Sequence, residues 1–352
     1  MSDSTNVRFI IYSGLTVLVM LFSCGCSREH RAVALYVDAV TLNEIGENEM
    51  AVEKLNSAVR INKRFSPAYS LLGDIYQKME DYEKSAASYE KATELNNWSF
   101  KDYFKLGEVY QVMKKFSQAA EAYAKACELG PDNPQAYINA AKCCYEIKDF
   151  NNVLVYGERA EKLDPNASEV QQMLGDVYES RKNHERAVAL YKKALETDSN
   201  NPAIMTSLAV VYLRTNRNEP AKELLTSAIQ IKPDNSAAYQ YLGYCYLRLR
   251  EQAIEAHRLE LKADSNTPSP IETAITGYLN EAIQSYNKAI EINDKDWEAY
   301  RGLGVAYMLR ALDNKDAELK AKAIEQWRAS LDIKPDQPRR DKLLELMRKY
   351  SN

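Results

Sequence analysis

Cysteine and histidine are the side chains in this sequence best suited to nucleophilic or metal chemistry. There are six cysteines and three histidines. A C-x-x-C pair is the usual signature of a cysteine-based zinc site or a dithiol site, and the sequence contains none. His30, His184 and His257 lie far apart in the chain. The sequence also lacks H-E-x-x-H, G-x-S-x-G and a glycine-rich phosphate loop. We therefore expect no enzyme activity, no catalytic residues, no bound metal and no cofactor.

The first two cysteines follow an apolar run. Arg8 precedes residues 9–22, which are almost entirely apolar, and Cys24 and Cys26 come directly after them. A basic residue, a short apolar stretch and small residues are typical of a secretory signal, and the run is short for a membrane span. We therefore assign residues 1–25 to a signal region and residues 26–31 to a tether. The alternative to the lipoprotein signal described next is an ordinary secretory peptide or an uncleaved anchor.

The cysteines at the end of this run resemble the lipid-attachment site of bacterial lipoproteins, in which the first mature residue is a lipidated cysteine. Leu21 favours attachment at Cys24, whereas Gly25 favours the alternative, Cys26. Neither cysteine is followed by aspartate. In lipoproteins of enteric-type bacteria, the absence of aspartate at this position implies transfer to the outer membrane. The resemblance implies a lipid-anchored protein of the cell envelope that faces the periplasm.

A repeat of about 34 residues organises the rest of the chain. The segment YFKLGEVY at 103–110 matches YSLLGDIY at 69–76 and QQMLGDVY at 171–178. Each is followed by a pattern such as Ala119, Tyr123 and Ala126, and often by a proline, such as Pro131. The spacing places the apolar residues on one face of each of two helices, and small residues allow those helices to approach closely. Each repeat is therefore predicted to be a helical hairpin.

The period and the spaced positions closely resemble the tetratricopeptide repeat (TPR) family. The resemblance implies an all-α, right-handed superhelical solenoid of antiparallel helix pairs. The eight expected repeats are 32–65, 66–99, 100–133, 134–167, 168–201, 202–235, 236–296 and 297–337, and residues 338–352 form a capping helix and the C-terminus. About 27 extra residues interrupt the seventh repeat. We interpret them as extensions of its two helices, with an inserted mini-hairpin as the alternative.

In this family the first helix of each repeat lines a concave groove. By register, the early groove is acidic and includes Asp74, Glu108 and Asp176. The late groove is apolar with arginines and includes Leu213, Arg214, Tyr244, Leu247, Arg248, Arg301 and Met308. Exposed apolar groups in a groove indicate a binding site, and arginine pairs well with carboxylates. We expect a partner segment with apolar and acidic character, unless the insertion or the capping helix fills this wall.

Charge and the remaining cysteines add two constraints. The formal net charge is −4, with both signs interspersed, whereas nucleic-acid binding needs a basic stripe. Cys127, Cys143, Cys144 and Cys245 occupy positions that are apolar in other repeats. They are expected to be buried thiols, with a disulfide between Cys127 and Cys143 as the alternative.

These observations predict a non-catalytic scaffold that binds a protein or peptide segment during assembly of an envelope complex, such as pilus, secretion, outer-membrane or cell-wall machinery. The alternative is an accessory subunit of a polysaccharide-export or peptidoglycan enzyme complex. The sequence gives no oligomeric state.

Overall fold

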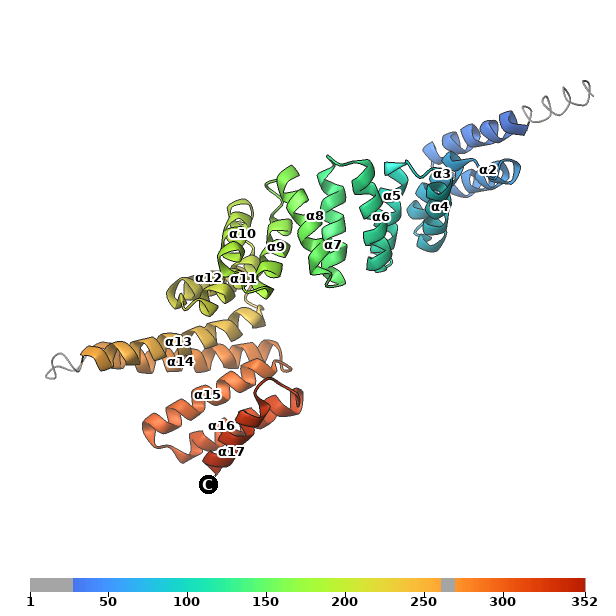
Figure 1. The fold of residues 1–352 in the computed structure, drawn as a ribbon. Coiled ribbons are helices and arrows are strands. Elements are labelled where there is room, and N and C mark those ends of the chain that lie inside the picture. The colour runs from blue at the N-terminus through green and yellow to red at the C-terminus, as the bar shows by residue number, and fades with distance from the viewer. Residues whose placement is uncertain (1–27, 261–269, 352) are drawn as a thin grey trace, which may run out of the picture. The chain divides into compact units, whose positions relative to one another are not determined.

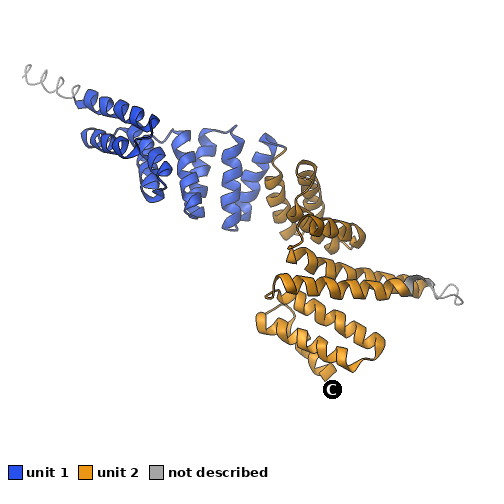
Figure 2. Ribbon diagram, turned by 180° about the vertical axis from the view of Figure 1, so that it is seen from behind, with its two compact units in different colours: residues 1–165 blue, residues 166–352 orange. Residues whose placement is uncertain are grey.

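The computed structural model describes residues 28–260 and 270–351, and the described residues form helices joined by short turns, with no strands among them. The chain divides at Pro165 into two compact units (Figures 1 and 2). The signal region and both candidate lipidation sites, Cys24 and Cys26, lie outside the described residues. None of the described helices is both long enough and apolar enough to cross a bilayer.

Unit 1 is described from residue 28 to residue 165 and is a stack of helical hairpins. Residues 28–44 are helical and include residues 28–31, which the sequence analysis assigned to the tether. The helices that follow are α2 (Asn48–Ile61), α3 (Ser66–Lys78), α4 (Tyr82–Leu95), α5 (Phe100–Val112), α6 (Phe116–Leu129), α7 (Pro134–Glu146) and α8 (Phe150–Leu163). The pairs α3–α4, α5–α6 and α7–α8 pack as hairpins, and each hairpin contacts the next.

Unit 2 continues the same pattern and ends in a single helix. Its helices are α9 (Ser168–Ser180), α10 (His184–Thr197), α11 (Pro202–Arg214), α12 (Asn218–Ile231), α13 (Ser236–Glu260), α14 (Pro270–Ile292), α15 (Trp297–Asn314), α16 (Ala317–Ile333) and α17 (Arg340–Ser351). From α3 to α15, the first helix of each hairpin begins at the first residue of the repeat that the sequence analysis delimited.

The extra residues of the seventh repeat lengthen both of its helices. Helix α13 has 25 residues and α14 has 23, whereas α11 has 13 and α12 has 14. The two long helices pack side by side (Figure 1), and Tyr246 stacks against Tyr278. The buried Arg250 guanidinium also pairs with Asp313 of α15 at 2.6 Å. The described residues thus form two extended helices, as expected, and not a separate mini-hairpin.

Each turn inside the regular hairpins uses the same backbone geometry. Glu80, Lys114, Lys148, Lys182 and Asn216 recur every 34 residues, and all have φ near +60°. A left-handed residue just after a helix lets backbone N–H groups bond to the last carbonyls of that helix. The Lys114 N–H, for example, donates to the Gln111 carbonyl oxygen at 3.0 Å. This turn sets the antiparallel path of the second helix.

Complementary side-chain sizes hold the two helices of a hairpin together. Gly107 of α5 faces the ring of Tyr123 of α6, and a Cβ atom at Gly107 would lie 2.8 Å from that ring. The pairs Gly73–Tyr89, Gly175–Tyr191, Gly243–Tyr286 and Gly304–Trp327 repeat this contact. At the corresponding positions of two other repeats stand the fully buried pairs Ala39–Leu55 and Ala209–Leu225. Where the second helix carries a large aromatic ring, the first helix has glycine opposite it, and where the second helix carries the smaller leucine, the first helix has alanine.

The four described cysteines are free and buried. No disulfide joins Cys127 to Cys143, so the bonded alternative is absent from this structure. Burial raises the pKa of the Cys127 and Cys143 thiols to about 12 and that of Cys144 to about 11. Thiols in this state are poor nucleophiles at neutral pH, and they serve here as small apolar groups.

Candidate binding groove

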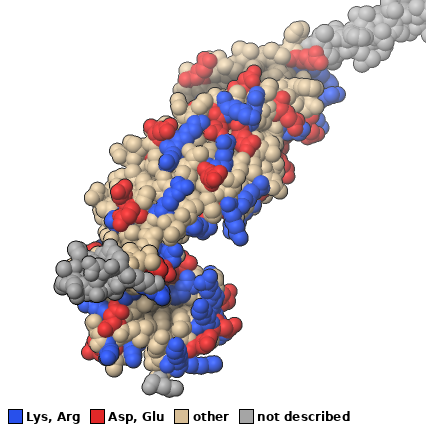
Figure 3. Space-filling model, turned by 60° about the vertical axis from the view of Figure 1, so that its left-hand side comes forward, with Lys and Arg blue, Asp and Glu red and all other residues tan. Residues whose placement is uncertain are grey.

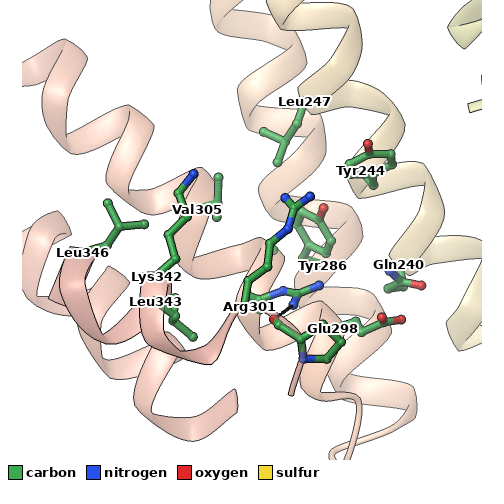
Figure 4. Close-up of a pocket in the computed structure, with 13 residues that line it drawn as sticks. Gln240, Tyr244, Leu247, Tyr286, Glu298, Arg301, Val305, Lys342, Leu343 and Leu346 are labelled. Carbon is green, nitrogen blue, oxygen red and sulfur yellow. Dashed lines mark hydrogen bonds between the residues drawn. The ribbon is translucent and has the colours of Figure 1, made fainter. Parts of the chain in front are cut away.

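A pocket of about 400 Å³ opens in unit 2 between α13, α15 and α17. We call it the α13–α15–α17 pocket. Tyr244 and Leu247 line it from α13, Arg301 and Val305 from α15, and α17 closes it with the side chains Lys342, Leu343 and Leu346. Figure 4 shows Arg301 between the α13 side chains and those of α17. The exposed lining is mainly apolar, which is typical of ligand and peptide sites.

The base of this pocket depends on Tyr286 of α14. Its ring is 2% exposed, and burial raises the pKa of its hydroxyl above the ordinary range. A Cβ atom at Gly302 would lie 2.3 Å from the ring, and one at Gly243 would lie 2.9 Å from it. Two glycines on neighbouring first helices thus let this ring reach the pocket from behind, where it forms a rigid apolar base.

The rim of the pocket is cationic. Arg301, Arg339 and Lys342 line it together with one carboxylate, Glu298. The Arg301 guanidinium lies 4.7 Å from the centre of the Trp297 ring and donates to the Pro338 carbonyl oxygen at 3.2 Å. These contacts fix Arg301 in place without neutralising its charge. Lys342 is exposed, so the pocket offers positive charge beside an apolar base.

Two of the expected groove residues are core residues instead. Leu213 is 5% exposed and Met308 is 4% exposed, so our assignment of both to an open groove wall was wrong. Leu213 belongs to the core cluster formed around α11 and α12. Met308 packs with Trp327 and Leu343, because α17 covers this part of α15. Tyr244 and Val305, in contrast, are 43% and 37% exposed.

Two of the three expected arginines are held outside the pocket. Arg214 forms an ion pair with Glu179 of α9. Arg248 pairs with Glu251 at 2.5 Å and donates to the Asn216 side chain at 2.9 Å. Of the three expected arginines, Arg301 alone lines the α13–α15–α17 pocket. The expected residues Tyr244 and Leu247 line it as well.

The expected acidic residues are bonded within their own units. In unit 1, Asp74 accepts hydrogen bonds from the Tyr89 hydroxyl and from Lys101 Nζ, both at 2.6 Å. Glu108 pairs with Lys105 at 2.8 Å. In unit 2, Asp176 accepts a hydrogen bond from the Tyr191 hydroxyl at 2.5 Å. Asp74 and Asp176 thus link the two helices of a hairpin, and lysines partly compensate the charges of Asp74 and Glu108.

A second pocket of about 480 Å³ lies next to the first, between α9, α11 and α13. We call it the α9–α11–α13 pocket. Its lining includes polar side chains, among them Ser207, Asn235 and Tyr241. The Glu179–Arg214 pair also lies here, so opposite charges face the same space. This pocket thus differs in polarity and in charge from the first.

The sequence analysis missed the contribution of α17 and Tyr286 to the first pocket. Residues 338–352 were predicted to form a capping helix and the C-terminus, but the helix also presents Lys342 and Leu346 to the pocket. The exposed surface of the described residues carries both charge signs interspersed, as Figure 3 shows for one face. No cluster of metal-ligating side chains occurs between residues 28 and 351 outside the gap at 261–269.

Four segments of the chain match tetratricopeptide repeat models: residues 66–97, 100–133, 178–243 and 274–309. No curated protein sequence matches the chain.

Solved TPR structures share the fold. The C-terminal part of a TPR repeat-containing protein from Cytophaga hutchinsonii is 15% identical, with a TM-score of 0.52 over 77% of this chain and 98% of that one. The APC/C hetero-tetramer Cut9–Hcn1 is 16% identical, with a TM-score of 0.52 over 89% of this chain and 55% of that one. YrrB, a TPR protein with an unusual peptide-binding site, is 24% identical, with a TM-score of 0.48 over 53% of this chain and 96% of that one. At these identities the two likenesses with TM-scores of 0.52 show the fold alone.

Proposed function

We propose that this chain, which carries tetratricopeptide repeats in both of its units, is a protein-interaction scaffold that holds a segment of a partner protein in the α13–α15–α17 pocket. The repeats and the helical solenoid are typical of non-catalytic scaffolds. The observation that carries the proposal is the pocket itself, an apolar base beside a cationic rim. Such a surface favours an apolar side chain next to a carboxylate, because apolar neighbours exclude water and strengthen the ion pair.

The process in which the scaffold acts is inferred from its N-terminal sequence. A lipid-anchored position in the cell envelope, facing the periplasm, follows from the lipoprotein-like run that ends at Cys24 and Cys26. A binding module held at a membrane meets partners that are themselves parts of envelope assemblies. We therefore place its role in the assembly of an envelope complex.

A crosslinking experiment in the native host tests the binding proposal. A photo-crosslinking amino acid at Tyr244 is expected to capture a discrete partner, because this residue is exposed in the pocket. The same amino acid at Leu259, which is exposed on the same helix outside the pocket, serves as the matched control. Val305→Ser should lower the yield at position 244 without lowering the melting temperature. Equal capture at both positions, or none at either, would contradict the proposal.

Lipid attachment is tested separately. Cells are labelled with an alkyne analogue of palmitate, and Cys24→Ser is compared with Cys26→Ser. We expect Cys24→Ser to abolish labelling and signal processing, because a thioether cannot form without the thiol, while Cys26→Ser leaves both unchanged. The reverse pattern would move the site to Cys26, and unchanged labelling in both variants would rule out a lipidated cysteine at this position.

A further inference from the structure

One stripe of helix α13 lines both pockets of unit 2. Ala237 and Tyr241 face the α9–α11–α13 pocket, while Gln240 and Tyr244 face the α13–α15–α17 pocket. These four residues have the spacing i, i+3, i+4 and i+7, so they share one side of the helix. Helix α13 also packs directly against α11 and against α15. The two pockets are therefore neighbours on one surface, separated by the width of a single helix.

The α9–α11–α13 pocket suits uncharged polar groups. The Tyr191 hydroxyl bonds to Asp176, and Arg214 pairs with Glu179. The exposed Lys232 is the second cation of the lining, so the two carboxylates and the two cations balance and leave no net charge there. Ser207 and Tyr241 supply hydroxyl groups to the lining. Hydroxyl groups both donate and accept hydrogen bonds. They can therefore bind the backbone or the uncharged polar side chains of an extended peptide.

The α13–α15–α17 pocket has the opposite character. Its base is Tyr286 and its walls include Leu247, Val305 and Leu346. The cations at its rim outnumber the carboxylates, since Arg301 and Lys342 are joined there by Arg339, with Glu298 alone against them. This excess of positive charge is complementary to a carboxylate that flanks an apolar side chain.

We propose that one extended segment of a partner protein crosses α13 and fills both pockets. Its uncharged polar residues lie in the α9–α11–α13 pocket, and an apolar residue beside an acidic one lies in the α13–α15–α17 pocket. The inference rests on the proposed function and specifies the recognised motif. Neighbouring helices lie about 8–10 Å apart, so the path from α11 to α15 is roughly 16–20 Å. At about 3.3 Å per residue, it is spanned by about five to six residues.

Occupying two pockets with one segment also strengthens binding. Once one half of the segment is bound, the other half is held at a high effective concentration near its pocket. Neither pocket then needs to bind tightly alone. The order and the spacing of the two halves supply specificity, because a segment with only one half loses this gain.

The test begins with a display library of random 12-residue peptides selected on the immobilised full chain. Enriched peptides are expected to share an acidic residue next to a large apolar one, with serine, threonine, asparagine or glutamine about four to six residues away. One selected peptide is then labelled with fluorescein, and its Kd is measured by polarisation for each variant. The melting temperature of every variant is measured alongside.

Each pocket has its own variant with a matched control. Lys342→Glu reverses a rim charge and is expected to weaken binding about fivefold or more, and wild-type affinity should fall as salt is added. Lys349→Glu, on the same helix outside the pocket, should leave the Kd unchanged. Ser207→Arg fills the polar pocket and should also weaken binding about fivefold or more. It should have no effect on a truncated peptide that lacks the polar half.

The outcomes separate this inference from the proposed function. If Lys342→Glu weakens binding but Ser207→Arg does not, the segment occupies one pocket only, and the inference is overturned while the proposed function stands. If no peptide is enriched, or if neither variant changes the Kd, both are overturned. If the full chain self-associates and Lys342→Glu disperses it, the occupant is a second copy, which also overturns the inference.

Discussion

Replacing Trp327 by alanine is expected to lower the free energy of unfolding of the C-terminal repeat by about 3–5 kcal/mol. Trp327 is 2% exposed and lies in the core between α15, α16 and α17. Its ring packs on Gly304, and its Nε1–H donates to the Arg301 carbonyl oxygen at 3.3 Å. An alanine would leave a large cavity, because the glycine opposite cannot fill the space.

The loss of stability in Trp327→Ala should be confined to the C-terminal end of unit 2. Repeat proteins are stabilised by contacts within each repeat and between neighbours, so α15–α17 should open first. Hydrogen exchange read by mass spectrometry is expected to show faster exchange in α15–α17 and unchanged exchange in α3–α6. Trp98→Ala is the matched control, because Trp98 is 79% exposed and surface changes usually cost within about 0.5 kcal/mol. Equal losses in the two variants would contradict the packing described for Trp327.

This variant also limits what a binding assay can show. Leu343, which lines the α13–α15–α17 pocket, belongs to the same core cluster as Trp327, and the Arg301 backbone is bonded to its indole. Loss of partner binding in Trp327→Ala would therefore follow from loss of the pocket and would not indicate direct contact. Variants at exposed positions, such as Val305 and Lys342, avoid this ambiguity.

The repeat architecture could be predicted from the sequence because its signals are local. The helical spacing of apolar residues and the recurring glycine, tyrosine and proline positions define each hairpin without reference to distant residues. The first residues of α3, α5 and α7 are those of the predicted repeats. The extension of α13 and α14 was expected for the same reason, since the apolar spacing continues through it.

The candidate site was predicted less well, because it depends on contacts between repeats. From the repeat register we predicted that Leu213 and Met308 line the groove, but neighbouring helices bury both of them. Asp74 was predicted to be an acidic residue of the groove, and the sequence did not show that Tyr89 and Lys101 both bond to it. These partners lie 15 and 27 residues away, and repeat register alone does not pair a side chain with a partner at such distances.

Gly107→Ala is expected to destabilise unit 1, although alanine is the better helix former. In a helix interior alanine is favoured over glycine by about 1 kcal/mol, but its Cβ would lie 2.8 Å from the Tyr123 ring. That ring is fully buried, and its hydroxyl is bonded to Gln111 at 3.0 Å, so it cannot easily move aside. Overpacking costs about 1–3 kcal/mol, so we expect a net loss of up to about 2 kcal/mol, measured by urea unfolding.

Gly277→Ala provides a control with the opposite sign. Gly277 lies within α14, and no heavy atom would lie within 4 Å of an added Cβ. Only the gain in helix propensity remains there, so this variant should be neutral or slightly more stable. Equal destabilisation at the two glycines would mean that contact with the tyrosine ring does not decide the effect.

The double variant Gly107→Ala with Tyr123→Leu tests whether the pair is coupled. The fully buried pairs Ala39–Leu55 and Ala209–Leu225 already show that this combination fits the same positions in two other repeats. The Tyr123→Leu change should therefore remove the overlap that alanine creates, and the two changes together should cost less than their sum. A positive coupling of this kind is the signature of residues in contact. Strict additivity would instead assign the loss in Gly107→Ala to the helix backbone rather than to complementary packing between the two helices.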